Sequence, residues 1–507
     1  MRSSRGALVI AFTTWLAGCT VGPDYHTPHV KLPDRFAAAS QAANAVNVTI
    51  DPGSWWRALN DPQLDSLIDR AIQANPSLEI ALTRLQEART FEAAVTGQAL
   101  PVLDASAGAA RGTGSNLARG RAGPPLVSAT NTKGLDQITS VVGFDAAWEI
   151  DLFGRYRREI EAARSDAQAA AATRNAVLVT VLADVARAYL DMRGLQTQLA
   201  VLRQNIRTAQ KLLDLVQARY DRGITNELDV TLARRQLATL QAQLEPLISQ
   251  IRGAQYAIAV LLGRFPEELA EELAKPELIP QVPEKIDAGL PIDLLRRRPD
   301  IQYAERSLAA ATARVGVATA NLFPRLALTA GAGYQGQGLG ETPVANQFIW
   351  SAGVAAIWPL LDFGVLDALV DIADLRTHEL LVSYKQTVLR AVQEVDGAIS
   401  NYTAQQDRLR NLGDALVASQ RAVSLATQRY DRGLTDFLNV VDAERQQYDL
   451  EEQYAGSQTA VAEQFVALYK ALGGGWEQYQ SVPPIRQPQP AIIAAFRRVL
   501  SPEDPLK

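Results

Sequence analysis

One segment of this chain occurs twice. Residues 219–230 read R-Y-D-R-G-I-T-N-E-L-D-V, and residues 429–440, which lie 210 positions later, read R-Y-D-R-G-L-T-D-F-L-N-V. Three further matches keep the same spacing of 210: Trp148 with Trp358, Phe153-Gly154 with Phe363-Gly364, and Leu262-Gly263 with Leu472-Gly473. We therefore expect the 507-residue chain to form one body of two similar halves, and not several unrelated domains.

The early part of each copy follows a different spacing. A spacing of 223 relates Pro76 to Pro299, Pro101 to Pro324, and Gly108 to Gly331. The change from 223 to 210 places 13 extra residues in the first copy, between Gly108 and Gly143. Insertions are tolerated in exposed connections, so we expect loops at this place in both copies.

Two long segments without proline, residues 154–220 and 364–430, carry apolar residues at seven-residue intervals. In the first segment this row is Leu178, Val185, Met192, Leu199, Ile206, Leu213 and Tyr220; in the second it is Val388, Val395, Tyr402, Leu409, Leu416, Val423 and Tyr430. An apolar period of 3.5 residues predicts helices that supercoil on partners. At 1.5 Å per residue each helix would be roughly 100 Å long, so we expect a rod-like protein.

The repeated segment marks the end of each long helix. Gly223 and Gly433 stand where a left-handed residue is expected just past a helix. Thr225-Asn226 and Thr435-Asp436 can cap a following helix. Such a short turn between two long helices predicts an antiparallel hairpin, whose second arm runs to about Leu262 or Leu472.

Prolines mark further helix starts. The signals are Asp61-Pro62, Asn75-Pro76 and Arg298-Pro299, which predict shorter helices near residues 76–98 and 299–321. The basic run Arg296 to Arg298 could suggest contact with phosphate or lipid head groups. Its place before Pro299 is interpreted more simply as a solvated approach to a helix.

Strands are predicted between these helices. In residues 138–150 the even positions are mostly apolar, with Phe144 and Trp148 among them, and residues 348–360 repeat this pattern. Alternation over more than ten residues is typical of a membrane-spanning strand. The preceding partners, about 101–112 and 324–336, show it more weakly, and alone they would also suit a buried hairpin of a soluble domain.

Four strands per chain are too few for a closed barrel, because the smallest transmembrane barrels have about eight. An open sheet edge in lipid would leave backbone groups unpaired, at a cost of several kcal/mol each. Copies of the chain must therefore assemble, with eight strands from two copies or twelve from three. The same assembly would complete a cylinder of helices.

The N-terminus reads as a lipoprotein signal. Arg2 and Arg5 precede the apolar stretch Ala7 to Trp15, and Leu16-Ala17-Gly18-Cys19 forms a lipobox. Cys19 is the only cysteine and is expected to carry N-acyl and S-diacylglycerol lipid; an ordinary signal peptide with a chance cysteine is the alternative. Thr20, in place of aspartate, favours sorting to the outer membrane.

Charge and histidine content argue against several classes of function. Removal of Arg2 and Arg5 with the signal leaves 48 of the 50 basic residues against 55 acidic ones, a net charge of −7, which gives no reason to expect nucleic-acid binding. The three histidines, His26, His29 and His378, lack partners at metal-ligand spacing. With no glycine-rich phosphate loop either, we expect no enzyme, no metal and no cofactor beyond the lipid.

Together these residues resemble the outer membrane efflux proteins of tripartite pumps, the TolC-type family, and in particular its NodT-like lipoprotein branch. The resemblance covers residue 19 to about 475. It is carried by C-T-V-G-P-D-Y at 19–25, Trp55-Trp56 ahead of Asp61-Pro62, R-R-P-D-I at 297–301, and the two R-Y-D-R-G turns.

The resemblance implies a mixed α and β fold that is mainly α. A homotrimer would build a twelve-stranded outer-membrane β-barrel, continued by a long periplasmic α-helical coiled-coil barrel. The implied parts are a signal peptide (1–18), an anchor and belt segment (19–60), a first repeat (61–263, with a β-hairpin at about 101–150), a belt linker (264–290), a second repeat (291–473, with a β-hairpin at about 324–361) and a C-terminal tail (474–507).

The resemblance also assigns roles at the two turns. The turns would form the periplasmic mouth, where an adaptor would contact Arg219, Tyr220, Gly223, Arg429, Tyr430 and Gly433. Leu438 and Asp442 match a constriction of the lipoprotein branch, and Asp229 holds the acidic place in the first copy. A ring of three carboxylates repels itself and attracts cations, so it could filter ions. The alternatives are turns that only end helices and acidic residues that only favour helix starts.

The implied function is a passive exit duct of an RND-type multidrug pump, with a periplasmic adaptor, an inner-membrane pump and outer-membrane lipid as partners. Type I secretion, or efflux of metals or phenolic acids, would use a similar duct. Export of soft metals is not favoured, because Met1 and Met192 are the only methionines. A lipid-anchored envelope scaffold that transports nothing would leave the alternating strands unexplained. The motifs identify neither the substrates nor the particular adaptor and pump.

Overall fold

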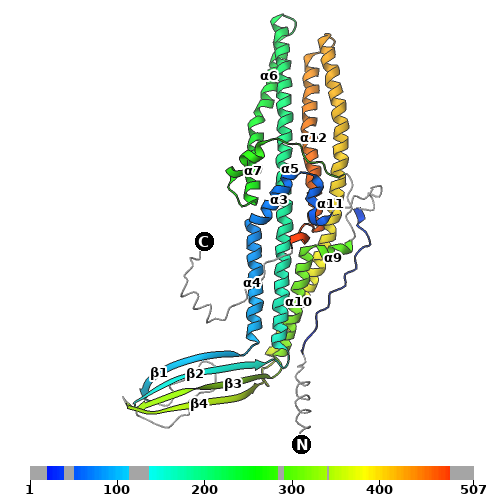
Figure 1. Ribbon diagram of the computed structural model, residues 1–507. Coiled ribbons are helices and arrows are strands. Elements are labelled where there is room, and N and C mark those ends of the chain that lie inside the picture. Colours follow the sequence, from blue (N-terminus) through cyan, green and yellow to red (C-terminus); the bar gives the residue numbers. More distant parts are fainter. Residues whose placement is uncertain (1–19, 39–50, 114–135, 284–290, 340–341, 480–507) are drawn as a thin grey trace.

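The computed structural model describes residues 20–38, 51–113, 136–283, 291–339 and 342–479. They form a long rod of helices with a four-stranded sheet that projects from one end (Figure 1). The turns of the helical hairpins lie at the opposite end of the rod. The structure is therefore mainly helical, as predicted. The expected signal peptide and Cys19 lie outside the described residues.

Two helices run the length of the rod. They are α5 (Arg155–Asp221) and α11 (Val365–Asp431), each of 67 residues. Each begins directly after a glycine in the left-handed region, Gly154 with φ of 84° and Gly364 with φ of 82°. The predicted pair of long helices is confirmed, and at 1.5 Å per residue each is roughly 100 Å long.

The return arms of the two hairpins differ. They are α6 (Glu227–Ala242) followed by α7 (Leu244–Leu261) in the first repeat, and the single helix α12 (Phe437–Leu472) in the second. Both arms end where predicted, near Leu262 and Leu472, but the arm of the first repeat is interrupted at Gln243. Pro246 explains the break, because it has no N–H to donate to the carbonyl of Ala242 and it disfavours helical geometry just before it. The second repeat has Gly456 at this position.

Three shorter helices begin at the predicted prolines: α3 (Pro62–Ala74), α4 (Pro76–Gln98) and α10 (Pro299–Ala320). A fourth, η1 (Pro52–Leu59), begins at a proline that was not among the predicted starts. The Asp61 carboxylate accepts from the N–H of Gln63 at 2.9 Å and caps α3. The Asn75 side chain accepts from Leu78 N–H at 3.1 Å and caps α4. These bonds satisfy backbone donors that a helix start leaves free.

The largest apolar core lies in the middle of the rod. Trp55 and Trp56 are each 1% exposed, and the Trp55 ring stacks on Tyr469 with centroids 5.8 Å apart. Leu269 and Leu273, from the segment between the repeats, join the same core. Short elements surround it: η2 (Pro266–Leu269), α8 (Ala270–Ala274), η3 (Pro291–Asp293), α9 (Leu294–Arg297) and η4 (Glu477–Tyr479).

The sheet is antiparallel with the order β1-β2-β3-β4. Its strands are β1 (Val102–Thr113), β2 (Asp136–Ile150), β3 (Arg325–Leu339) and β4 (Thr342–Ile357). The two predicted hairpins are confirmed, and they join through β2 and β3. Within one chain, β1 and β4 are therefore the two edges of the sheet. The connection predicted to carry the 13-residue insertion lies largely outside the described residues.

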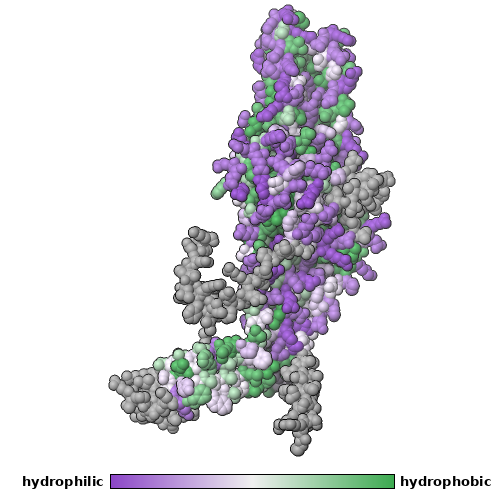
Figure 2. Space-filling view, in the orientation of Figure 1, coloured by the Kyte–Doolittle hydropathy of each residue, from purple (hydrophilic) through white to green (hydrophobic). Residues whose placement is uncertain are grey.

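Large apolar side chains gather on one face of the sheet. Phe144 opposes Ala332, which in turn opposes Trp350, so all three share this face. Its exposed members, between 39% and 72% exposed, are Val142, Phe144, Trp148, Tyr334, Phe348, Trp350 and Val354. Figure 2 shows mainly hydrophobic or neutral residues over the sheet and mainly hydrophilic ones over the rod. The predicted alternation is confirmed, and this face suits contact with lipid.

One helix is apolar enough to be compared with a membrane span. Among the described residues, α5 alone reaches the length and mean hydropathy required. Because 56% of the relevant stretch is buried inside the protein, packing within the rod accounts for its apolar side chains.

Candidate channel mouth

The two hairpins end in turns of the same geometry (Figure 1). Gly223 has φ of 72° and Gly433 has φ of 65°, so both are left-handed. In each turn the residue after the glycine donates its N–H to the carbonyl of the repeated arginine: Ile224 to Arg219 at 2.9 Å, and Leu434 to Arg429 at 2.9 Å. These bonds close the last turn of each long helix.

Arg219 connects the two turns. From the first hairpin, its guanidinium lies 2.9 Å from the Asp431 carboxylate on the second. The same group lies 4.8 Å from the centroid of the Tyr430 ring. Tyr430 is only 8% exposed and its ring lies 5.2 Å from that of Phe437. A partly exposed ion pair and a cation–π contact contribute about 1 kcal/mol or less each, so this connection is weak enough to open.

The residues equivalent to Arg219, Asp431 and Tyr430 in the other repeat of the same chain are arranged differently. Arg429, the counterpart of Arg219, is exposed and makes no ion pair with any described residue. Asp221, the counterpart of Asp431, accepts from Gln217 on its own helix at 2.9 Å. Tyr220 is 40% exposed, whereas Tyr430 is 8% exposed. Within one chain, therefore, Arg219 contacts Asp431 and Tyr430, whereas the equivalent Arg429 does not contact Asp221 or Tyr220.

An apolar cluster lies directly beneath the turns. It combines residues of both hairpins: Val216, Val230, Ala233, Tyr430, Phe437, Val440 and Val441. Non-directional contacts of this kind tolerate small shifts of one helix against another. The two hairpins are thus joined by one apolar cluster and one charged contact at the end of the rod.

The predicted gate residues of the second hairpin share one face of α12. Leu438 is 59% exposed, and Asp442 follows it by four residues. The Asp442 carboxylate lies 2.9 Å from the Arg445 guanidinium and accepts from Gln446 at 2.9 Å. Sequence reasoning missed Arg445, although its position three residues after Asp442 is a signal for such a pair. The gate role of Leu438 and Asp442 stays a prediction.

Asp229 takes part in a local contact at a helix start. The Thr225 hydroxyl donates to the Asp229 carboxylate. In the second copy the Asn439 amide donates to the Thr435 hydroxyl at 2.8 Å. The Asp229 N–H also donates to Asn226, which caps α6 as predicted. Asp436 makes no corresponding side-chain cap, so that part of the capping prediction is wrong.

A second residue missed by sequence reasoning is Glu444. It is 6% exposed, and the Tyr448 hydroxyl donates to its carboxyl group at 3.3 Å. Burial raises the pKa of Glu444 to about 7. Its position seven residues after Phe437 could have identified it, because it puts a carboxyl group where the heptad pattern expects an apolar side chain.

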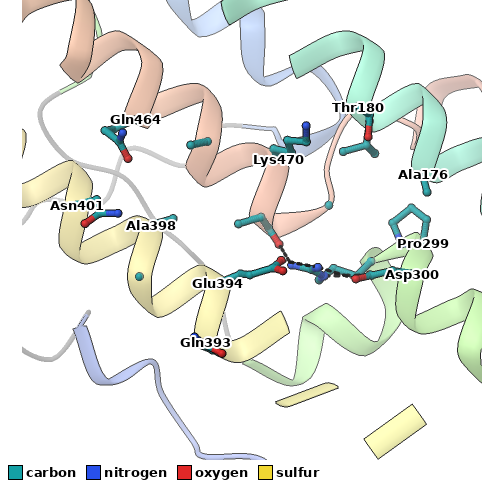
Figure 3. Close-up of a pocket in the computed structure, with 16 residues that line it drawn as sticks. Ala176, Thr180, Pro299, Asp300, Gln393, Glu394, Ala398, Asn401, Gln464 and Lys470 are labelled. Atoms are coloured by element: carbon teal, nitrogen blue, oxygen red, sulfur yellow. Dashed lines mark hydrogen bonds and ion pairs between the residues drawn. The ribbon is translucent and has the colours of Figure 1, made fainter. Parts of the chain in front are cut away.

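Farther along the rod, an open pocket of about 650 Å³ lies where α5, α10, α11 and α12 meet (Figure 3). Arg298 lies at this pocket and is 7% exposed. Its guanidinium donates to the carbonyl of Ala471 at 2.7 Å and contacts Glu394 at 2.7 Å and Asp300 at 2.6 Å. Arg298 thus links α10, α11 and the end of α12 at one side of the pocket, and we interpret this side as a structural junction.

The interpretation of the basic run as solvated is therefore wrong for Arg298 and right for Arg296, which is exposed. The physical reason is a backbone carbonyl near the end of α12 that needs a donor. The first repeat solves the same problem with Asn75, whose amide donates to the carbonyl of Leu261 at 2.7 Å. Leu261 and Ala471 are counterparts at the spacing of 210.

The segment that follows Cys19 is bound at the junction of rod and sheet. Arg158, near the start of α5 and 4% exposed, donates to the carbonyl of Val21 at 3.2 Å and contacts the Asp24 carboxylate at 2.7 Å. Gly22, with φ of 86°, lies so close to Gly316 on α10 that a β-carbon would overlap it. The T-V-G-P-D sequence is thus shaped to bind this junction.

Comparison with known proteins gives consistent matches. Residues 67–264 and 290–474 match the family described as "Outer membrane efflux protein". The chain is 30% identical over 466 residues to nodulation protein T of Rhizobium leguminosarum bv. trifolii, covering 92% of this chain and 96% of that protein. It is 33% identical over 424 residues to the pyoverdine export outer membrane protein OpmQ of Pseudomonas putida, covering 83% and 88%. The structure of the outer-membrane channel OprN matches with a TM-score of 0.81 at 34% identity, covering 91% of this chain and 100% of that one.

Proposed function

Because this chain belongs to the outer membrane efflux protein family and extends from the outer membrane into the periplasm, we propose that three copies form the passive exit duct of an RND-type tripartite efflux pump. The matched family and structures are channels and not enzymes. The duct would do no chemistry of its own, and the inner-membrane pump would supply the energy.

The observation that carries the proposal is an unmatched helix face on α11. The long helix of the first repeat, α5, packs along α10 of the second repeat, with Arg314 of α10 ion-paired to Asp166 of α5. Four α5 residues there are between 3% and 8% exposed: Ala162, Ser165, Ala172 and Val179. Their counterparts on α11 are between 43% and 69% exposed: Ile372, Leu375, Val382 and Leu389.

A second copy of the chain would cover this face. The helix that corresponds to α10 in the first repeat is α4, since Pro76 and Pro299 begin the two helices. Packing α11 of one copy on α4 of the next repeats the α5 and α10 contact already present within each chain. Phe91, which is 59% exposed on α4, corresponds to Arg314 of α10. Such a heterologous contact generates a closed ring when the rotation closes.

The sheet supports the same assembly. With β1 and β4 as its edges, β4 of one copy can pair with β1 of the next. Three copies would then close twelve strands and leave no unpaired edge in lipid. The apolar face that includes Phe144 and Trp350 would point to the membrane.

The turns would form the mouth of the duct. Arg219 already contacts Asp431 and Tyr430 within one chain. In a ring, Arg429 of one copy would contact Asp221 and Tyr220 of the next in the same way. The mouth would then be held by contacts that alternate within and between chains. Gly223 and Gly433, with no atom close to the β-carbon position, would leave room for an adaptor at each turn.

Inside this mouth we propose that Leu438 and Asp442 form the constriction, with Asp229 as a second acidic position. Asp442 is half exposed on α12, so a ring of these carboxylates would attract cations. Arg445 beside Asp442 would balance part of that charge. The arrangement favours a narrow polar gate over a wide open pore.

Cys19 is the proposed site of lipid attachment. The adjacent Thr20 lies against Gly154, just before α5 and close to the end of β2. A lipid on the preceding residue would start at the junction of sheet and rod. This position suits an anchor in the inner leaflet of the outer membrane.

A change in drug accumulation tests the duct. Deletion of the gene should raise the cellular accumulation of a fluorescent drug several-fold, and expression of the wild-type chain should reverse the change. Leu389→Arg should fail to reverse it, because a charge in the α11 interface would block assembly. If deletion changes envelope integrity but not accumulation, the chain is a scaffold. Identification of the adjacent adaptor and pump separates drug efflux from type I secretion and from metal or phenolic-acid efflux.

A further inference from the structure

A buried carboxyl group lies just inside the mouth, outside the proposed gate. Among the described residues, Glu444 is the only acidic residue that is nearly fully buried, at 6% exposure. It lies on α12 between Val441 and Tyr448, one helical turn from each. Neither Leu438 nor Asp442 shares this environment, since Leu438 is 59% exposed and the Asp442 side chain is half exposed.

The surroundings of Glu444 come from both hairpins. Toward the turns, Val441 belongs to the apolar cluster that also holds Val216 of α5 and Val230 of α6. Away from the turns, Tyr448 packs in a second cluster with Leu202 of α5 and with Leu237 and Leu240 of α6. Glu444 therefore lies in the seam between the two hairpins, and this seam must open if the hairpins separate.

No cation balances this carboxyl group within the described residues. Among the described residues its hydrogen-bond partner is the hydroxyl of Tyr448; burial raises the pKa of Glu444, and this hydrogen bond lowers it by less. Asp442 and Arg445, on the same helix, pair with each other. The charged residues of the neighbouring helices are exposed: Arg203, Arg207, Lys211 and Asp214 on α5, Arg234 and Arg235 on α6, and Asp414 and Arg421 on α11.

We propose that Glu444 is a proton-dependent lock between the two hairpins of each chain. The closed seam holds it as a neutral acid among apolar side chains, whereas separation of the hairpins exposes it to water, where it ionises. The proposal rests on the proposed function, because it assigns a regulator to the same mouth. Its physical basis is the high cost of burying a carboxylate without a cationic partner.

The direction of the pH effect follows from proton binding. Burial raises the pKa of Glu444 from its ordinary value of 4.5 to about 7 in the closed seam. Exposure on opening returns it toward the ordinary value, so the closed seam binds more protons between these two values. The stabilisation of the closed seam is fully present below about pH 4.5 and is lost as the pH rises to about 7.

The experiment follows the distance between the two turns. Spin labels on the exposed positions Arg222→Cys and Arg432→Cys report separation of the hairpins in the full-length protein in lipid vesicles. A protein without these two cysteines controls for label at Cys19. For the wild-type Glu444 background, the ratio of separated to closed hairpins should rise by about tenfold or more from pH 5 to pH 7.

Three variants make the test specific. Glu444→Gln keeps the size and removes the titration, so its hairpins should stay closed and independent of pH over this range. Tyr448→Phe removes a hydrogen bond to the ionised form and should move the transition to higher pH by about one unit or less. Glu452→Gln, an exposed position on the same helix, should behave as the wild type. Circular dichroism of each variant checks the fold.

Two outcomes would overturn the lock: no pH response in the wild-type background, or an unchanged response in Glu444→Gln. Single-channel currents of the same proteins separate this idea from the duct itself. Hairpins that respond to pH through Glu444 without any current at any pH would support the lock and contradict the duct. Currents with no role for Glu444 would support the duct and contradict the lock.

Discussion

The first repeat and the second repeat share one order of short helix, β-hairpin, long helix and return arm, but they bury equivalent faces to different extents. On α5, Ala172 and Val179 are 3% and 6% exposed. Their counterparts on α11, Val382 and Leu389, are 53% and 67% exposed. Under the proposed assembly, the difference marks where a second copy of the chain would bind: α10 covers this face on α5, whereas the equivalent face of α11 is exposed among the described residues.

The two turns also differ in the burial of equivalent residues. Arg219 covers Tyr430 and pairs with Asp431, whereas Tyr220 is 40% exposed and Arg429 is exposed. The duplicated residues are the same, so the difference comes from neighbours and not from sequence. In a ring where contacts within a chain alternate with contacts between chains, the two turns of each chain would have equivalent neighbours.

The largest effect is expected from Leu389→Arg. A charge in the proposed α11 and α4 interface would leave roughly 3–5 kcal/mol of uncompensated burial at each contact, so the trimer should be lost. Val417→Arg is the matched control, because Val417 is 69% exposed and its counterpart in the first repeat is the exposed Arg207. Light scattering in detergent gives the mass of each. Trimers of unchanged stability in Leu389→Arg would remove α11 from the interface.

The second-largest effect is expected on stability, at the two junctions where Arg298 and Asn75 each bind the carbonyl of a residue near the end of a return arm. Arg298→Ala removes a buried donor to the carbonyl of Ala471 and should destabilise the chain by about 2–3 kcal/mol. Asn75→Ala, at the equivalent junction, removes a helix cap and should cost about 1–2 kcal/mol. Thermal unfolding measures both against the exposed control Arg296→Ala. Equal losses in Arg298→Ala and Arg296→Ala would contradict the junction role.

At the turns, the two arginines should be equivalent in the assembly. Arg219→Ala and Arg429→Ala should each raise the resting conductance several-fold, since each contact contributes about 1 kcal/mol. Arg222→Ala, a neighbouring exposed position, should leave the conductance near the wild-type value. An effect of Arg219→Ala with none of Arg429→Ala would mean that the contact is made only within chains.

The smallest effect is expected at the acidic positions. Asp442→Asn should lower the preference of the pore for cations by about twofold, because a ring of charges at a constriction selects ions. Asp229→Asn should change it less, since the Asp229 carboxylate already accepts from the Thr225 hydroxyl. Reversal potentials in a salt gradient measure both variants. A larger change in Asp229→Asn would reverse the assignment of the main acidic ring.

Much of the fold could be predicted from repeated residues. The row from Leu178 to Tyr220 predicted α5 because a seven-residue apolar period suits only a long packed helix. Gly223 and Gly433 predicted the two turns, and the alternation around Phe144 predicted strand β2. These features depend on local sequence, so no knowledge of distant neighbours was needed.

Other features depended on tertiary contacts. The break at Gln243 follows from Pro246, and the rows of apolar residues used to predict the long helices do not extend to this proline. The burial of Arg298 required knowledge that the end of α12 arrives beside it. The family resemblance pointed to Leu438 and Asp442 at the mouth but not to Glu444. The heptad position of Glu444 on its own helix is a signal, but its burial depends on the facing hairpin, which the sequence does not show.

Single-channel recording of the purified protein in planar lipid bilayers tests the central claim most directly. The account predicts discrete conductance steps for the wild-type protein, the same steps for Val417→Arg, and none for Leu389→Arg. Purified wild-type protein that inserts but gives no steps at any voltage would contradict the proposal that this chain forms an exit duct. Steps of unchanged size from Leu389→Arg would contradict the assembly through α11.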